Sequence, residues 1–311
     1  MPAVRLSIIV PFYNVEPYIG RCLDSIYRQD LREEEYEVIC VDDCSPDNSI
    51  SIVEQYSARH SNLKIVRNKE NRKLGGARNA GLEEAKGNYI WFIDSDDFIE
   101  DNVLERLCAE AEKDDLDVLH FDYEKYPSKE PLRELESTAI MTGTEMFFDN
   151  RFIWYHDLIT AWRKLYKRSF LIANDITFAE HIMWEDDDYL INVFAKAQKV
   201  RHIHLVAYYY CDNPNSVTRV KYDSSHIFYW VDLCSRLERM RQSFLNDGID
   251  NRFQPLIRDL IRFHIGNTFK EYRSLQGDEK KKSRRIIRQN LFGLRGYISR
   301  KNFYSFILRI I

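Results

Sequence analysis

Apolar residues in the first 125 positions alternate between two spacings. Short apolar runs of strand length occur five times, at residues 6–10, 36–41, 63–66, 89–93 and 117–121. Between them, apolar residues recur every three or four positions, as on the buried face of a helix, at residues 15–26, 49–58, 74–85 and 103–111. Strands that alternate with helices predict an α/β fold with a mostly parallel sheet flanked by helices. We expect Pro11 to end the first strand, because proline cannot donate to a strand ladder.

This alternation stops near residue 127, and helical patterns dominate the end of the chain. A late strand is predicted at 200–211, followed by a turn at 213–215. Three helices are then predicted, at 224–245, 254–272 and 278–291. A length of 311 residues accommodates one large domain with an appendage. We therefore expect a domain over 1–218, with halves 1–125 and 126–218, and a C-terminal helical region over 219–311.

Composition and charge narrow the class of protein. With 44% hydrophobic residues the chain is not a disordered or low-complexity sequence. The net charge of −4 hides an asymmetry, because the last 32 residues hold ten Lys or Arg and no acid. Basic residues mixed with apolar ones in 280–311 are typical of a segment that binds an anionic membrane surface. The alternative is a set of helices packed on the body with a solvated basic face. The acidic remainder, without a nucleic-acid motif, argues against a nucleic-acid partner.

Cysteine spacing and hydropathy predict the compartment. The six cysteines include no C-x-x-C pair, which argues against a zinc ribbon and a secreted disulfide framework. The N-terminus lacks the pattern of a signal peptide, and no apolar run has the length of a membrane span. We expect a cytoplasmic protein, with peripheral binding to the inner face of the plasma membrane through 280–311 as a hypothesis.

Candidate chemistry lies where strands end, because ligands of open parallel sheets bind beyond the carboxyl ends of the strands. No G-x-G-x-x-G follows the first strand and no Walker A loop is present, which excludes the common dinucleotide and P-loop sites. Asp42 ends the second strand, where a carboxylate either accepts hydrogen bonds from a base or ribose or begins a turn. Residues 43–49 have the composition of a turn and a helix N-cap.

Three carboxylates, Asp94, Asp96 and Asp97, follow the apolar strand at 89–93. Like charges at one strand tip repel each other unless a cation or several donors offset them. Carboxylates suit Mg²⁺ or Mn²⁺, which commonly also binds substrate phosphates. The alternative is a solvated acidic loop that caps the following helix, and it fits Asp97 better than Asp94 or Asp96.

Two further stretches carry candidate residues. Residues 72–81 are rich in Gly and Ala, which allow close backbone approach, and Arg78 among them could reach a diphosphate. The alternative is a loop and a packed helix with Arg78 as a surface charge. The acidic run 185–188 opens a predicted helix, where the helix dipole favours acids. Trp184 and Tyr189 beside the run suggest partial burial, where a carboxylate can act as a general base.

These segments, in this order, resemble glycosyltransferase family 2, inverting enzymes of the GT-A fold. The matching segments are SIIVPFYN at 7–14, VDDCSPDNS at 41–49, GGARNAG at 75–81, AKG at 85–87, YIWFIDSDD at 89–97 and ED at 185–186. The resemblance covers residues 5 to about 215. The Q-x-x-R-W motif of the family's processive synthases is absent, which favours transfer of a single sugar.

The resemblance implies a role for each candidate residue. On the donor side, Asp42 would bind the nucleotide base, normally uracil. The remaining nucleotide or donor-side residues would be Pro11, Tyr13, Asn14, Arg78, Asp94, Ser95 and Lys164, the last of which could instead lie near the acceptor. Asp96, the second Asp of the D-x-D motif, would bind Mn²⁺ or Mg²⁺ at the diphosphate. Asp186 would be the base, with Glu185 as the neighbouring candidate.

The function implied is metal-dependent, inverting transfer of one sugar from a nucleotide sugar, expected to be a UDP-sugar. The acceptor would be a hydroxyl of a glycan or lipid-linked glycan in cell-surface polysaccharide or glycolipid synthesis. Two alternatives remain open: a catalytically silent subunit that binds nucleotides or glycans, and a nucleotidyltransferase with a related core.

Overall fold

The computed structural model describes residues 4–127, 135–149, 152, 158–213, 223–290 and 296–297. The chain divides into two compact units, Met1–Pro214 and Asn215–Ile311, and each is described here by itself. Among the described helices, none combines the length and the apolar character that crossing a membrane requires.

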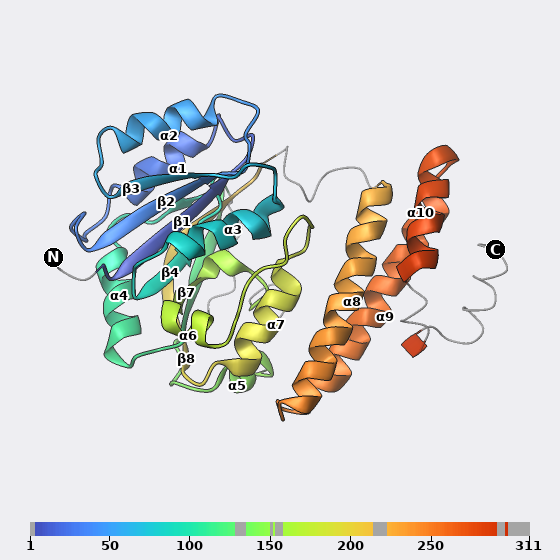
Figure 1. Ribbon diagram of the computed structural model, residues 1–311. Helices are drawn as coiled ribbons and strands as arrows, with labels where there is room; N and C mark the ends of the chain where they lie inside the picture. The colour runs from blue at the N-terminus through green and yellow to red at the C-terminus, as the bar shows by residue number, and fades with distance from the viewer. Residues whose placement is uncertain are drawn as a thin grey trace. The chain divides into compact units, whose positions relative to one another are not determined.

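One sheet of eight strands forms the centre of the first unit, in the order β3-β2-β1-β4-β7-β6-β8-β5 (Figure 1). Its strands are β1 (Leu6–Phe12), β2 (Tyr36–Asp42), β3 (Leu63–Arg67), β4 (Tyr89–Phe92), β5 (Phe98–Ile99), β6 (Val118–Tyr126), β7 (Lys164–Lys167) and β8 (Val200–Cys211). The four strands β3, β2, β1 and β4 pair in parallel with one another. The prediction of a mostly parallel sheet is confirmed for this half.

Helices cover both faces of the sheet because both faces are apolar. The helices of this unit are α1 (Ile19–Ile26), α2 (Ser49–Ser57), α3 (Lys73–Glu84), α4 (Leu104–Lys113), α5 (Gly143–Phe147), α6 (Arg168–Ala173) and α7 (Asp186–Lys196), with a 3₁₀ turn at Ala161–Arg163. Leu6, Ile8 and Val10 of β1 share a core with residues of α1, α2 and α4. On the opposite face α3 packs so closely that a Cβ added to Gly81 would lie 2.4 Å from Ile9. Small residues in α3 therefore bring this helix against the strands.

The second half of the sheet is mixed and departs from the predicted alternation. β7 pairs antiparallel with β4 and β6, and β5 pairs antiparallel with β8. Neither β5 nor β7, of two and four residues, was predicted. The predicted end of the first strand at Pro11 is wrong, since β1 continues to Phe12. On β1, only Leu6–Ile9 pair with β4. Pro11 lies beyond the ladder between β1 and β4, so the strand continues past this proline.

The described part of unit Asn215–Ile311 contains three α-helices, as predicted. They are α8 (Ser224–Asn246), α9 (Phe253–Ser274) and α10 (Gly277–Asn290), and α8 lies alongside α9 (Figure 1). α10 packs chiefly on α8 and buries Ser283 and Ile287. The remaining parts of the predicted basic tail, residues 291–295 and 298–311, lie outside the described residues.

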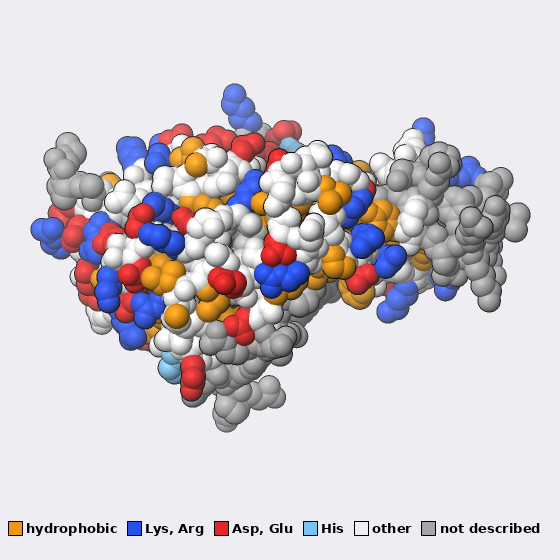
Figure 2. All heavy atoms as spheres, turned by 90° about the horizontal axis from the view of Figure 1, so that it is seen from below, with side chains coloured by type: hydrophobic (Ala, Val, Ile, Leu, Met, Phe, Trp, Pro, Cys, Tyr) orange, Lys and Arg blue, Asp and Glu red, His pale blue; other side chains and the backbone are white. Residues whose placement is uncertain are grey.

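Charged side chains of both signs are interspersed on the described surface that Figure 2 shows. Ion pairs join neighbouring elements of the first unit, such as Arg67 of β3 with Glu54 of α2 at 2.6 Å. Exposed pairs of this kind contribute little to stability individually.

Candidate active site

The carboxyl ends of β2, β1 and β4 lie side by side and bring three loops together. The backbone N–H of Asn14, after β1, donates to Ser45 Oγ at 2.8 Å. The N–H of Ser45 in turn donates to Asp42 Oδ1 at 2.8 Å, and the N–H of Asp43 donates to Phe12 O at 3.1 Å. The loops after β1 and β2 therefore form one rigid edge, at the place where ligands of such sheets bind.

This edge presents an aromatic ring and a carboxylate. Tyr13 is 49% exposed, Pro11 is buried, and Asn14 has a left-handed φ of 55°. Asp42 is partly buried, with one oxygen engaged by Ser45. Pro11, Tyr13, Asn14 and Asp42, the residues predicted for one nucleotide pocket, therefore lie at the carboxyl ends of the paired strands β1 and β2.

Arg78 of α3 connects the loop after β4 with the start of α7. Its side chain is 1% exposed, and its Nη2 donates to Asp94 Oδ1 at 2.8 Å. Its Nη1 donates to Glu185 Oε1 at 3.0 Å and to Asp186 Oδ1 at 2.7 Å. One buried cation thus holds three carboxylates from segments about a hundred residues apart. The interpretation of Arg78 as a surface charge is wrong.

The three carboxylates differ in their access to solvent. The side chains of Asp94 and Asp186 are 21% and 23% exposed, whereas that of Glu185 is 9% exposed. Burial and the neighbouring charge of Asp186 raise the pKa of Glu185 from 4.5 to about 7, against the opposing effect of Arg78. Burial also raises the pKa of Asp94. Protonation of Glu185 would relieve the excess of negative charge around Arg78.

The loop after β4 is anchored through its backbone and through Asp97. Arg21 of α1 donates to the carbonyl of Asp96 at 2.8 Å. Asp97 is 1% exposed and accepts from Tyr208 Oη and from the N–H of Cys211, both at 2.6 Å. Burial raises its pKa well above the ordinary range. The interpretation of Asp97 as a solvated helix cap is therefore wrong, because it ties the loop to β8.

Asp96 and Ser95 lie on the same loop with different exposure. Ser95 is buried, and Asp96 is half-buried with its Oδ2 accepting from Asn213 Nδ2 at 2.8 Å. Within the described residues, no three His, Cys, Asp or Glu side chains are grouped as ligands of one metal ion.

Lys164 lies on β7, and its side chain is fully buried. Its Nζ donates to the carbonyls of Leu158 and Thr160 at 2.8 and 2.7 Å. Ala161, which follows Thr160 in the chain, donates its backbone N–H to Asp186 Oδ2 at 3.2 Å. Lys164 thus fixes the backbone segment that meets Asp186.

Three contacts of the site were not predicted from the sequence. They involve the N–H of Ala161, the hydroxyl of Tyr208 and the amide of Asn213. A backbone N–H carries no side-chain signature, and Asn213 belonged to a predicted turn. The one signal in the sequence was position: Tyr208 lies near the end of the predicted strand 200–211 and Asn213 lies just after it, and strand ends are where ligands of such sheets bind.

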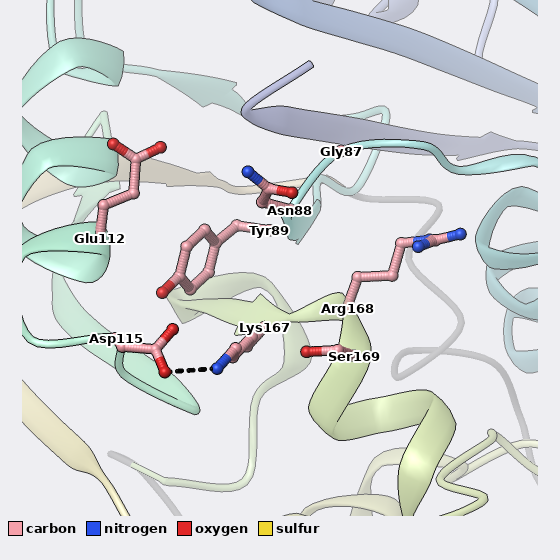
Figure 3. A pocket seen from close by; sticks show the side chains of 8 residues that line it. All are labelled: Gly87, Asn88, Tyr89, Glu112, Asp115, Lys167, Arg168 and Ser169. Carbon is pink, nitrogen blue, oxygen red and sulfur yellow. Dashed lines mark hydrogen bonds and ion pairs between the residues drawn. The ribbon is translucent and has the colours of Figure 1, made fainter. Parts of the chain in front are cut away.

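A cavity of about 340 Å³ lies at the opposite ends of the strands (Figure 3). It is lined by Gly87, Asn88, Tyr89, Glu112, Asp115, Lys167, Arg168 and Ser169. Asp115 and Lys167 form an ion pair across it at 2.7 Å. Because β4 begins here, this cavity lies at the amino ends of the parallel strands, where α/β sheets do not usually bind their ligands.

Two bacterial proteins are similar to this chain in sequence. The uncharacterized glycosyltransferase EpsJ of Bacillus subtilis is 36% identical over 227 residues, which are 70% of this chain and 64% of EpsJ. The poly(ribitol-phosphate) beta-glucosyltransferase of Bacillus spizizenii is 32% identical over 230 residues, 72% of this chain and 33% of that protein. This chain thus spans between a third and two thirds of these two relatives.

A solved structure shows the same fold. The crystal structure of Staphylococcus aureus TarS 1-349 in complex with UDP-GlcNAc matches with a TM-score of 0.71 and 24% identity, over 91% of this chain and 79% of that one. The predicted GT-A fold is confirmed. The model of glycosyl transferase family 2 matches residues 7–173, more than half of the chain. This protein therefore belongs to glycosyltransferase family 2.

Proposed function

We propose that this protein is an inverting glycosyltransferase that transfers one sugar from a UDP-sugar to an acceptor hydroxyl. The observation that carries the proposal is the buried Arg78, which brings Asp94 of the D-x-D loop to Glu185 and Asp186. A donor bound along the loop after β4 would therefore have its sugar next to a carboxylate that can act as a base.

The edge formed by the loops after β1 and β2 supports nucleotide binding. Tyr13 offers an exposed ring on which a base can stack, and Asp42 offers an acceptor for a base N–H. The TarS structures in complex with UDP-GlcNAc and with UDP make uridine diphosphate the first candidate. We assign Pro11, Tyr13, Asn14 and Asp42 to the nucleoside, and Asp94 and Ser95 to the ribose and sugar.

Asp96 fits a divalent cation. Mg²⁺ and Mn²⁺ bind through one or two carboxylates together with waters and substrate phosphates, so a full cluster of protein ligands is not required. Asp96 is half-buried, and Asn213 engages one of its two oxygens. A mannosyltransferase with the same fold, at a TM-score of 0.53, binds GDP-Man and Mn²⁺. When bound, the cation would offset the charge that develops on the departing diphosphate.

Exposure favours Asp186 over Glu185 as the base. Asp186 is more exposed than Glu185, and Arg78 and the N–H of Ala161 each donate to one of its oxygens. In the reaction, Asp186 takes the proton of the acceptor hydroxyl while that oxygen bonds to the anomeric carbon. The bond from this carbon to the diphosphate oxygen breaks on the opposite face, and the configuration inverts.

We assign the acceptor to cell-surface glycans, including lipid-linked ones. This assignment follows the relatives that act on poly(ribitol phosphate). On α10, Lys281, Arg285 and Arg288 are exposed, opposite the buried Ser283 and Ile287. This basic face could bind an anionic membrane and place the enzyme near such acceptors.

The test is UDP release from a panel of UDP-sugars with Mn²⁺, water serving as the acceptor. Loss of a general base commonly costs about 10² to 10⁴ in rate, so we expect Asp186→Asn to release UDP at least a hundredfold more slowly. Asp175→Asn is the matched control, because Asp175 is exposed and its left-handed φ of 51° is tolerated by Asn. Equal rates for wild type and Asp186→Asn would refute the base assignment. No UDP release by wild type would favour a silent binding subunit.

A further inference from the structure

The segment from Phe178 to Glu185 leads directly to Asp186 and lies against α3. Its backbone contains two residues in the left-handed region, His181 with φ 60° and Trp184 with φ 59°. Such conformations are costly for residues with large side chains and persist only where surrounding contacts hold them. Contacts with α3 are therefore needed to keep this segment in place.

Asn79 of α3 makes these contacts with both sides of its amide. Its Oδ1 accepts from the N–H of Phe178, and its Nδ2 donates to the carbonyl of Phe178, both at 2.9 Å. The same Nδ2 donates to Glu180 Oε1 at 3.0 Å. Arg72 donates to both oxygens of Glu180, from Nε to Oε2 and from Nη2 to Oε1. Asn79 is 6% exposed, so it is not placed to touch a substrate.

Gly75 allows the segment to lie this close to α3. A Cβ at position 75 would lie 2.1 Å from the carbonyl oxygen of Ala179 and 3.2 Å from Cβ of Glu185. The first is a backbone atom, so the segment itself would have to move. We name the contacts of Arg72, Gly75 and Asn79 with residues 178–185 the clasp.

We propose that Asn79 is a positioning residue that sets the placement of the base Asp186 through the clasp. The inference rests on the proposed function. The ring of Phe178 stacks on Tyr189 of α7 at 3.6 Å, and the guanidinium of Arg78 lies 5.1 Å from the same ring. A shift of Phe178 would thus displace both Tyr189 of α7 and Arg78, the cation that holds Asp186. A cavity of about 540 Å³, lined in part by Asn79, Phe178 and Glu180, gives the released segment space to move.

Two variants disturb the clasp in different ways. Asn79→Ala removes the bonds to Phe178, and Gly75→Ala wedges the segment away from α3. Asn79→Asp is a third variant of nearly the same shape, which keeps the acceptor for the N–H of Phe178 but places a carboxylate oxygen against the carbonyl of Phe178 and against Glu180. The matched controls are Asn174→Ala, which also removes an amide-to-backbone bond, and Gly266→Ala, at a helical glycine with open space around it.

The experiment measures kcat and KM for the UDP-sugar that the wild type turns over, and the Kd of UDP with Mn²⁺ by calorimetry. We expect kcat to fall at least tenfold in Asn79→Ala, Asn79→Asp and Gly75→Ala, and not in the controls. The Kd of UDP is expected to stay within threefold of wild type, because the clasp lies on the base side of the site.

Two results would overturn the inference. One is a kcat that stays within twofold of wild type both in Gly75→Ala and in a folded Asn79 variant, either Asn79→Ala or Asn79→Asp. The other is a parallel loss of kcat, UDP affinity and melting temperature, which a merely structural role produces. Asp186→Asn separates the two proposals: if it is inactive while the clasp variants are fully active, only the role of Asn79 fails. If Asp186→Asn is fully active, the base assignment itself fails.

Discussion

Glu185 carries a buried charge whose stability cost depends on pH, and Glu185→Gln tests this directly. The glutamine removes the ionisable group and keeps an oxygen that can accept from Arg78 Nη1. In the wild type, burial and Asp186 raise the pKa of Glu185 from 4.5 to about 7. The folded state therefore binds more protons than the unfolded state between these values. By linkage, the stability contributed by protonated Glu185 is complete below pH 4.5 and is lost as the pH rises toward 7.

The size of the effect follows from the same two values. One unit of pKa corresponds to about 1.4 kcal/mol, so the rise to about 7 corresponds to a loss on the order of 3 kcal/mol by pH 8. Glutamine has no such loss. The free energy of unfolding of Glu185→Gln, relative to wild type, should therefore improve by about 3 kcal/mol between pH 4.5 and pH 8. For a domain of this size, that equals roughly 6 to 12 °C in melting temperature.

The assay is calorimetric melting of both proteins at pH 5, 6, 7 and 8 in one ionic strength. The difference between the two proteins at each pH cancels the titration of groups that they share. A difference that does not change between pH 5 and pH 8 would refute the reasoning, as would a glutamine variant that loses stability relative to wild type as the pH rises.

The remaining predictions concern the other buried charges and the basic helix. Arg78→Met should lower the free energy of unfolding by about 3–5 kcal/mol at pH 8, because three carboxylates lose their cation, and by less at pH 5, where protonation relieves them; melts that fall equally at both pH values would contradict this. Asp97→Ala should cost about 1–3 kcal/mol, since the Tyr208 hydroxyl loses its buried acceptor, and an unchanged melting temperature would count against the anchoring role. Lys281→Glu with Arg285→Glu should abolish flotation with anionic vesicles, at about 1 kcal/mol per basic group removed; undiminished flotation would exclude α10 as the membrane surface.

Local sequence rules located the strand-end part of the site. An apolar run followed by a carboxylate places Asp42 and Asp94 at the ends of β2 and β4, which flank β1, and parallel topology then brings those ends to the same side of the sheet. The start of α7 at Asp186 could also be predicted from the sequence, because acidic residues are favoured at a helix N-terminus. These positions follow from contacts within about ten residues.

Contacts between residues far apart in the sequence could not be predicted from such local patterns. The ion pairs of Arg78 with Glu185 and Asp186 join residues 107 and 108 positions apart, and nothing in the composition around Arg78 shows that its charge is buried. Asp97 resembled a solvated cap because the two groups that donate to it, the Tyr208 hydroxyl and the Cys211 N–H, lie on β8, more than a hundred residues away. The short strand β7 was missed because four residues carry too little periodicity to distinguish a strand from a loop.

The most direct test of the account is calorimetric titration of the intact chain with UDP, with and without Mn²⁺, in wild type and in Asp96→Asn. The account predicts that wild type binds UDP more tightly when Mn²⁺ is present, and that Asp96→Asn removes this dependence on Mn²⁺. At a hundredfold excess of UDP over its Kd, the same binding should add about 2.7 kcal/mol to the stability of the wild type. Absence of UDP binding under both conditions would contradict the proposed donor site, and Mn²⁺-dependent binding that persists in Asp96→Asn would contradict the role of Asp96.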